Sequence, residues 1–147
     1  MAMIKQKLDM SQMNHEYFDE TRILGIMAPV KNYYFIWMLN SFLDFNFSLY
    51  TDAPVEMHKK NRIYRFNLYT STHTESSLVH YLYQNQCDGE ALLPELKHLD
   101  FIWLMKGDRI ADNRCHHMME NIKKLGNVQL VTEITVDQIK NISNLII

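Results

Sequence analysis

Two carboxylates beside Pro94 are the residues of this chain whose types and spacing come closest to acid–base chemistry. Glu95 follows the proline directly, and Asp100 stands at the head of an apolar run. Two carboxyl groups in one pocket can divide the roles of general acid and general base. In the alternative, structural interpretation, Glu95 accepts backbone N–H bonds at a turn and Asp100 pairs with a Lys or Arg. We favour the structural interpretation, because no further polar cluster accompanies the pair.

The other nucleophilic and metal-binding residue types are scattered. His116 and His117 are adjacent, so on a helix their side chains point about 100° apart and cannot hold one ion together. His80 falls in a predicted strand and is expected to be buried and hydrogen-bonded. Cys87 and Cys115 lack CxxC spacing and are expected to be free thiols. The sequence therefore predicts no catalytic residue, no metal site and no cofactor.

One dense basic run suggests a weaker, nucleic-acid-binding interpretation. Lys59, Lys60 and Arg62 precede two aromatic residues, an order typical of single-strand binding surfaces. The alternative is a solvent-exposed turn before a strand whose aromatic side chains face the core. The net charge of −2 favours the turn, and an RNA-associated role would need the run to extend into a basic face with Lys123 and Lys124.

The apolar run that follows Asp100 predicts the central strand. Residues 99–105 are rich in large apolar side chains and lie between Pro94 and Gly107, so we expect a strand covered on both faces. Asp100 at its mouth must be hydrogen-bonded or paired, because burying an unpaired charge is costly. Strict alternation places four residues on one face: Leu99, Phe101, Trp103 and Met105.

Residues 30–45 carry the clearest helical pattern. Five apolar residues recur at helical spacing: Phe35, Met38, Leu39, Phe42 and Leu43. Tyr34, Ile36 and Trp37 widen the apolar surface beyond one stripe. Either this helix is buried on more than one side of the fold, which we favour, or part of it meets a second subunit or a protein partner. Trp37 and Trp103 are the predicted partner surface.

The remaining patterns complete an α+β architecture. A second helix is expected to be capped at its start by Asp112 or Asn113 and to end at Gly126 and Asn127. The segments 63–69 and 78–83 are expected to pair as a hairpin. The 147 residues, 47% of them hydrophobic, predict a single domain, residues 1–147, with two helices and one mainly antiparallel or mixed sheet of five to seven strands. Strand-like patterns cover residues 22–27, 45–49, 63–69, 78–83 and 128–133. Residues 4–10 are expected to form a short strand or an arm, and residues 136–139 either a further strand or a short turn.

The residues around the central strand resemble the signature of the bacterial IPExxxVDY family. Three residues match it outright: Pro94, Glu95 and Asp100. Three others stand in for its Ile, Val and Tyr: Leu93, Leu99 and Phe101. Two further stretches are similar to the family: Met38-Leu39-Asn40, and residues 136–147 with Asn144-Leu145-Ile146. The resemblance implies membership of a family of uncharacterised function found in Bacteroidetes-type bacteria, and it implies no activity.

Two classes of function remain open from the sequence. The first is a small cytoplasmic, non-enzymatic binding or adaptor protein, acting with a protein partner or as a homodimer; the ten methionines and many aromatic residues favour it. The second is a small-molecule-binding protein or enzyme in which Glu95 and Asp100 converge on one pocket with raised pKa values. Residues 1–7 lack a signal-peptide pattern, and no apolar segment reaches the ~20 residues of a membrane helix, so no membrane contact is expected.

Overall fold

A strand with large apolar side chains on both faces organises the protein. In the computed structural model, which describes residues 16–147, this strand is β9 (Phe101–Lys106), and its first five residues are all buried. β9 lies between β1 (Arg22–Met27) and β6 (Val79–Gln84). The six-stranded sheet has the order β10-β1-β9-β6-β5-β2, and every neighbouring pair is antiparallel. The predicted α+β class with one main sheet is confirmed.

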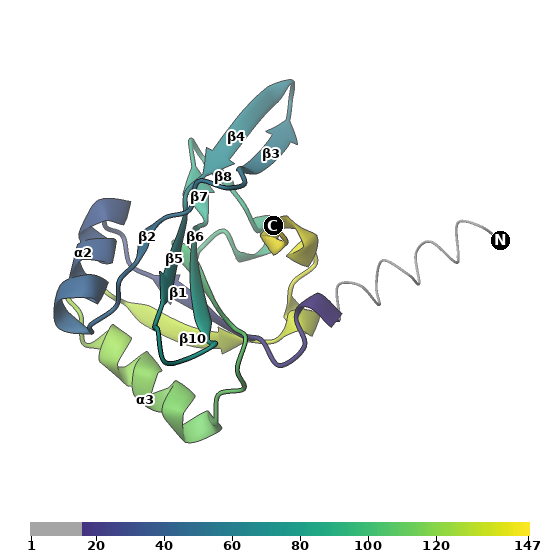
Figure 1. The fold of residues 1–147 in the computed structure, drawn as a ribbon. Coiled ribbons are helices and arrows are strands. Elements are labelled where there is room, and N and C mark those ends of the chain that lie inside the picture. Colours follow the sequence, from purple (N-terminus) through teal and green to yellow (C-terminus); the bar gives the residue numbers. More distant parts are fainter. Residues whose placement is uncertain (1–15) are drawn as a thin grey trace.

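The other strands complete this sheet and form two short hairpins beside it. Its remaining members are β2 (Ser48–Leu49), β5 (Leu68–Thr72) and β10 (Leu130–Ile134). The hairpins are β3 (Val55–Lys59) with β4 (Arg62–Phe66), and β7 (Gln86–Cys87) with β8 (Glu90–Ala91). The predicted strand at 63–69 is interrupted at Asn67. Its first part joins the β3–β4 hairpin, which projects from the sheet (Figure 1), and β5 pairs with β6 as predicted.

Two helices cover one face of the sheet (Figure 1), and turns of 3-10 helix cover the other. Helices α2 (Asn32–Phe42) and α3 (Asp112–Lys123) pack against the side chains of Phe101, Trp103 and Met105. The opposite face contacts the chain end, with η1 (Pro94–Leu96), η2 (Val136–Gln138) and η3 (Ile142–Leu145) nearby. Each face therefore has its own apolar core, as an internal strand with buried residues on both faces requires.

One prediction about the sheet differs from the structure, the position of Leu99. It packs in the core opposite to that of Phe101 and Trp103. It precedes the strand and lies in a turn, where its N–H donates to the carbonyl of Leu96, so strand alternation does not apply to it. Residues 136–139 form η2 and its cap, which agrees with the second of the two alternatives predicted there, a short turn after a strand. The strand or arm predicted at residues 4–10 lies outside the described residues.

The start of α3 also differs from the prediction. The N-cap residue is Ala111, without a side-chain capping bond, and neither Asp112 nor Asn113 fills that role. The carboxylate of Asp112 instead forms an ion pair with Arg22 of β1. This pair connects the first turn of α3 to the sheet that it covers.

Candidate functional site

Asp100 lies at the start of β9, where it lines a pocket of about 450 Å³. Its Oδ2 accepts a hydrogen bond of 2.8 Å from the backbone N–H of Ala28, which follows β1. Burial raises the pKa of the Asp100 carboxyl, and the bond from Ala28 opposes that shift. The predicted Lys or Arg partner is wrong for residues 16–147, in which Asp100 forms no ion pair. Its Oδ1 makes no hydrogen bond there.

Three parts of the fold surround this cavity, which we call the Asp100 pocket. Lys31 and Tyr33 come from the entry to α2 and its first turn. Asn67 and Tyr69 come from the start of β5, the end of β6 adds Gln84, and the start of β7 adds Gln86. With Asn32 of α2, the pocket combines one carboxylate, one ammonium, four amides and aromatic side chains.

Three of the four amide side chains in the pocket donate hydrogen bonds to other residues of the protein. Gln86 donates from Nε2 to the carbonyl of Leu99 at 2.9 Å, and Asn67 donates from Nδ2 to the hydroxyl of Tyr69 at 3.3 Å. Gln84 is engaged at both ends of its amide, with Asn67 and Gln86. Among the described residues, the side-chain oxygens of Asn67 and Gln86 accept no hydrogen bond. With Asp100 Oδ1 they make the pocket rich in free acceptors.

Glu95 serves a different part of the fold. Its carboxylate accepts two bonds from Asn141, from the backbone N–H at 2.9 Å and from Nδ2 at 2.8 Å. Burial opposes the charged form, but the hydrogen bonds from Asn141 prevail and lower the pKa of Glu95. Glu95 does not line the Asp100 pocket. The hypothesis that Glu95 and Asp100 converge on one pocket is therefore wrong, and the structural interpretation of Glu95 is confirmed.

The other two signature residues have structural surroundings. Pro94 begins η1, where its missing N–H removes no bond. Phe101 is buried and its ring stacks on Phe35 of α2, with ring centroids 4.5 Å apart. The signature thus surrounds the entry to β9 and brings only Asp100 and Phe101 to the pocket.

Asn85 is a central residue that sequence reasoning missed. Its buried side chain donates to the carbonyls of Leu96 and Leu99, at 3.0 and 2.9 Å, and accepts from the N–H of Leu93 at 2.9 Å. These bonds fix the loop that carries the signature. The sequence offers one signal for this role, an amide residue directly after the apolar strand β6.

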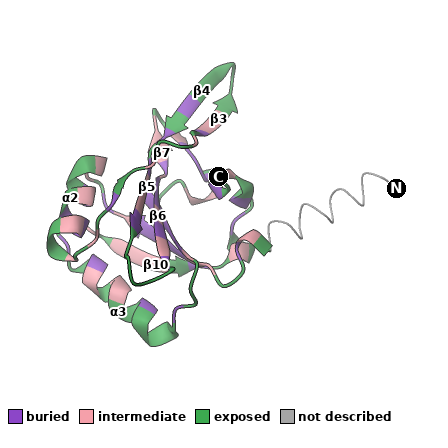
Figure 2. Ribbon diagram, in the orientation of Figure 1, coloured by how far each residue is buried: buried purple, intermediate pink, exposed green. Residues whose placement is uncertain are grey.

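The outer side of α2 is coloured as exposed in Figure 2, and it carries large aromatic residues. Trp37 is 52% exposed, Tyr33 72%, Phe42 62% and Tyr34 40%. Tyr34 stacks on Trp37 at 5.8 Å between centroids, and Phe42 meets Trp37 edge-on at 5.4 Å. We call these four residues the aromatic face. The favoured prediction, that this helix is buried on more than one side of the fold, is wrong for Tyr34 and Trp37, and the predicted inward position of Phe42 is also wrong.

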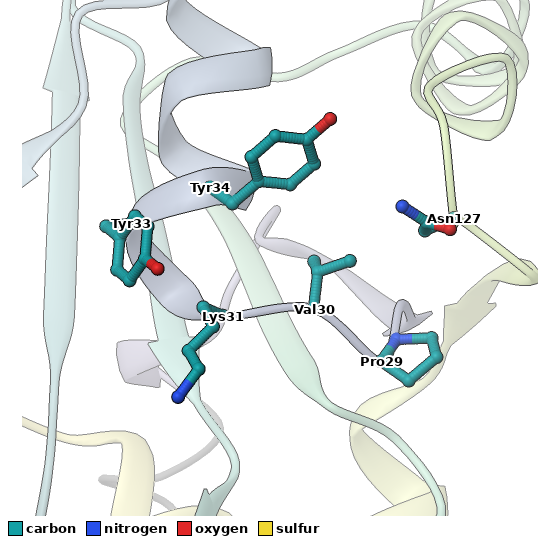
Figure 3. Close-up of a pocket in the computed structure, with 6 residues that line it drawn as sticks. All are labelled: Pro29, Val30, Lys31, Tyr33, Tyr34 and Asn127. Carbon is teal, nitrogen blue, oxygen red and sulfur yellow. The ribbon is translucent and has the colours of Figure 1, made fainter.

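The aromatic face borders two hollows at the start of α2. The first, of about 570 Å³, lies between Tyr34, Val30 and Asn127. Figure 3 shows Tyr34 extending from α2 toward Asn127, while the amino group of Lys31 points away from both. The second is the Asp100 pocket, and Tyr33 lines both hollows.

Trp103 is not a partner surface. It is fully buried, and its indole N–H donates to Nδ1 of His80 at 3.0 Å. Burial lowers the pKa of His80 to about 4, so the imidazole is neutral and can accept this bond. The prediction of a buried, hydrogen-bonded His80 is confirmed, and the prediction for Trp103 is wrong because its strand lies at the centre of the sheet.

The basic run is paired with acidic residues of the neighbouring hairpin. Lys59 binds Glu90 at 2.9 Å, and Arg62 forms an ion pair with Asp88. Lys60 lies in the tight β3–β4 turn with a positive φ. The β3–β4 hairpin projects from the sheet at a distance from α3 (Figure 1), whose end carries Lys123 and Lys124. The extended basic face that an RNA-associated role needs does not form.

Metal ligands and reactive thiols do not assemble in the part of the chain that the structure describes. His116 and His117 are exposed on α3, and no group of three His, Cys, Asp or Glu residues between positions 16 and 147 could hold a metal ion. Cys115 is buried and Cys87 half-buried, and both are free thiols as predicted. Over the same residues, no helix has the length and apolar character needed to cross a membrane.

Comparison of the chain with protein-family models, curated proteins and solved structures finds no match. The function must therefore be argued from the aromatic face and the Asp100 pocket.

Proposed function

We propose that this protein is a small, non-enzymatic binding protein of the adaptor type, and that its aromatic face docks on an apolar surface of another protein. The observation that carries the proposal is the composition of α2. Its eleven residues include no charged side chain, although four large aromatic rings face outward. Aromatic residues are enriched and charged residues depleted at the centre of protein interfaces.

The size of the aromatic face suits one type of interface. A large aromatic side chain buries 150–250 Å², so the exposed fractions of the four rings correspond to roughly 450 Å² of aromatic surface. Interfaces of standard size bury about 800 Å² per partner, and many obligate homodimers bury far more. The face thus matches the central part of a standard-size contact. We therefore commit to a different protein as partner and treat a homodimer as the competing outcome.

Location and family membership are part of the same proposal. We place the protein in the cytoplasm, because free thiols at Cys87 and Cys115 suit a reducing compartment. Membership of the IPExxxVDY family is supported by contacts between the two regions that resemble it. Glu95 of the signature binds Asn141, and Asn144 donates from Nδ2 to the carbonyl of Leu92 at 2.8 Å. If the family shares both stretches, its members would keep this contact between the signature loop and residues 141–144.

The test places a photo-crosslinking amino acid at position 34, in the middle of the aromatic face, in cells that make the protein. A protein crosslinked there is then purified and titrated against the wild type, Trp37→Ser and a control, Ile63→Ser. Ile63 is also an exposed apolar residue, but it lies on the projecting hairpin. We expect Trp37→Ser to weaken binding at least tenfold, since interface aromatic residues often contribute about 2 kcal/mol or more, and Ile63→Ser to bind as the wild type.

Two outcomes would contradict the proposal. If crosslinks join only copies of this chain, and light scattering shows a dimer that Trp37→Ser dissociates, the face is a homodimer interface. If the purified partner binds Trp37→Ser as tightly as the wild type, the aromatic face is not the docking surface.

A further inference from the structure

The Asp100 pocket holds two opposite charges that do not neutralise each other. Asp100, just before β9, and Lys31, at the entry to α2, both line it. Neither forms an ion pair within residues 16–147, with the other or with a third residue. Charged groups that line one cavity without a partner are available to a ligand, and a bound counter-charge would offset the desolvation of Asp100.

The lining residues that the sheet and its hairpins supply suit an ammonium group. An ammonium group presents three hydrogen-bond donors and no acceptor. Three lining residues offer oxygens that accept no bond among the described residues: Asn67 and Gln86 through their amides, and Asp100 through Oδ1. The orientation of the Gln86 amide is fixed, because its Nε2 donates to the backbone carbonyls of Lys97 and Leu99. These acceptors favour a cation over an anion.

The lining residues at the start of α2 suit a carboxylate. Besides Lys31, they include Asn32 and Tyr33, whose backbone N–H groups have no acceptor among the described residues. Such N–H groups lie at the positive end of the helix dipole. Tyr33 and Tyr69 add aromatic surface to the lining, and about 450 Å³ falls within the usual range for small-molecule pockets.

We propose that the Asp100 pocket binds a free α-amino acid, with its ammonium group at Asp100 and the amide oxygens of Asn67 and Gln86, and its carboxylate at Lys31 and the first turn of α2. The side chain of the amino acid packs against Tyr33 and Tyr69. Tyr33 belongs to both this pocket and the aromatic face, whereas Trp37, Phe42, Asp100 and Lys31 each belong to only one of the two sites. Substitutions at Asp100 and Lys31 therefore test the ligand site without changing a residue of the proposed docking surface.

The test is calorimetric titration of the full chain with each proteinogenic amino acid at millimolar concentration. The amino acid that binds most tightly is then compared with its N-acetyl derivative, which lacks the ammonium, and its methyl ester, which lacks the carboxylate. Each derivative should bind roughly ten- to a hundredfold more weakly, the range expected for losing a hydrogen bond to a charged group. If no amino acid binds, or if either derivative binds as tightly as the parent, the proposal is overturned.

Two substitutions locate the site. Asp100→Asn removes the charge but keeps an oxygen that can accept the Ala28 N–H, and Lys31→Gln alters an exposed residue, so both variants should remain folded. We expect each to weaken binding at least tenfold, and the exposed control Lys140→Gln to bind as the wild type. A variant is used only after its thermal unfolding shows a folded protein. If amino-acid binding survives both Asp100→Asn and Lys31→Gln, the ligand lies elsewhere and the proposal is overturned.

Discussion

Acid is expected to destabilise the fold through His80. The imidazole is buried among aromatic rings, including those of Phe45 and Trp103, and its Nδ1 accepts the indole N–H of Trp103. Burial, with smaller contributions from the charges of His73 and Arg114, lowers the pKa of His80 to about 4. Protonation would place a charge in an apolar cluster and would remove the acceptor that Trp103 needs.

The sign and size of the effect follow from that pKa. An unfolded chain binds the proton near the ordinary pKa of 6.5, whereas the folded protein binds it only near 4. Stability from neutral His80 is therefore fully present above pH 6.5, declines as the pH falls below 6.5, and is lost by about pH 4. Since each pKa unit corresponds to about 1.4 kcal/mol, the loss is about 3 kcal/mol.

The assay compares urea unfolding of the wild type and His80→Asn between pH 7.5 and pH 4. Asn has an oxygen near the position of Nδ1, so it can still accept the Trp103 N–H, but it does not titrate. Other groups, among them Asp100 with its raised pKa, titrate in both proteins and cancel in the difference. We expect the stability advantage of the wild type over the variant to shrink by about 3 kcal/mol on acidification.

The result that would refute this reasoning is a constant difference between the two proteins across the pH range. His80 would then be protonated equally in the folded and unfolded states, which is incompatible with a buried imidazole that accepts a hydrogen bond from Trp103. Nuclear magnetic resonance titration of the His80 ring provides an independent check, with an expected midpoint near pH 4.

Three substitutions should destabilise the protein in urea unfolding by different mechanisms. Asn85→Ala removes three buried side-chain bonds to the signature loop and should cost about 3 kcal/mol; an unchanged midpoint would contradict that role. Tyr83→Phe leaves the buried carbonyl of Leu145 without its donor and should cost about 1–2 kcal/mol, with faster amide exchange in η3; unchanged exchange would count against it. Gly107→Ala should cost about 2 kcal/mol or more, because φ is +109° and a Cβ would lie 2.1 Å from the carbonyl oxygen of Ser77. This loss of stability should exceed that of Gly89→Ala, since a Cβ at Gly89 would meet open space. Equal losses in the two variants would contradict the steric argument.

The two tryptophans show what local pattern can and cannot predict. Trp103 lies in an uninterrupted apolar run, and the strand that the run predicts is present, but the burial of this particular residue depends on two flanking strands and two helices. In α2 the spacing correctly selects Phe35, Met38 and Leu39 as buried. It does not show that Trp37 and Phe42 lack cover, because apolar residues lie on every side of that helix.

Strand pairing is the second feature of the fold that local sequence pattern does not predict. Alternation across residues 63–69 correctly places Tyr64, Phe66 and Leu68 inward, since all three are buried. It does not reveal the interruption at Asn67, whose backbone N–H donates to Oε1 of Gln84. The strands on either side of Asn67 pair with different neighbours, β4 with β3 and β5 with β6. The partner of a strand is a non-local property, so the order of the sheet could not be derived from period-two patterns alone.

The signature carboxylates were found from sequence, but their separate roles depend on distant residues. Glu95 is tied to Asn141, 46 positions away, and Asp100 to Ala28, 72 positions away. One oxygen of Asp100 thereby fixes the connection that carries Lys31 into α2, and the other lines the pocket without a partner among the described residues. Asp100→Ala would not show which role of Asp100 matters for binding, because it would remove both the hydrogen bond to Ala28 and the carboxylate that lines the pocket. Asp100→Asn separates these roles, since it retains the acceptor and removes only the charge that an ammonium ligand would need.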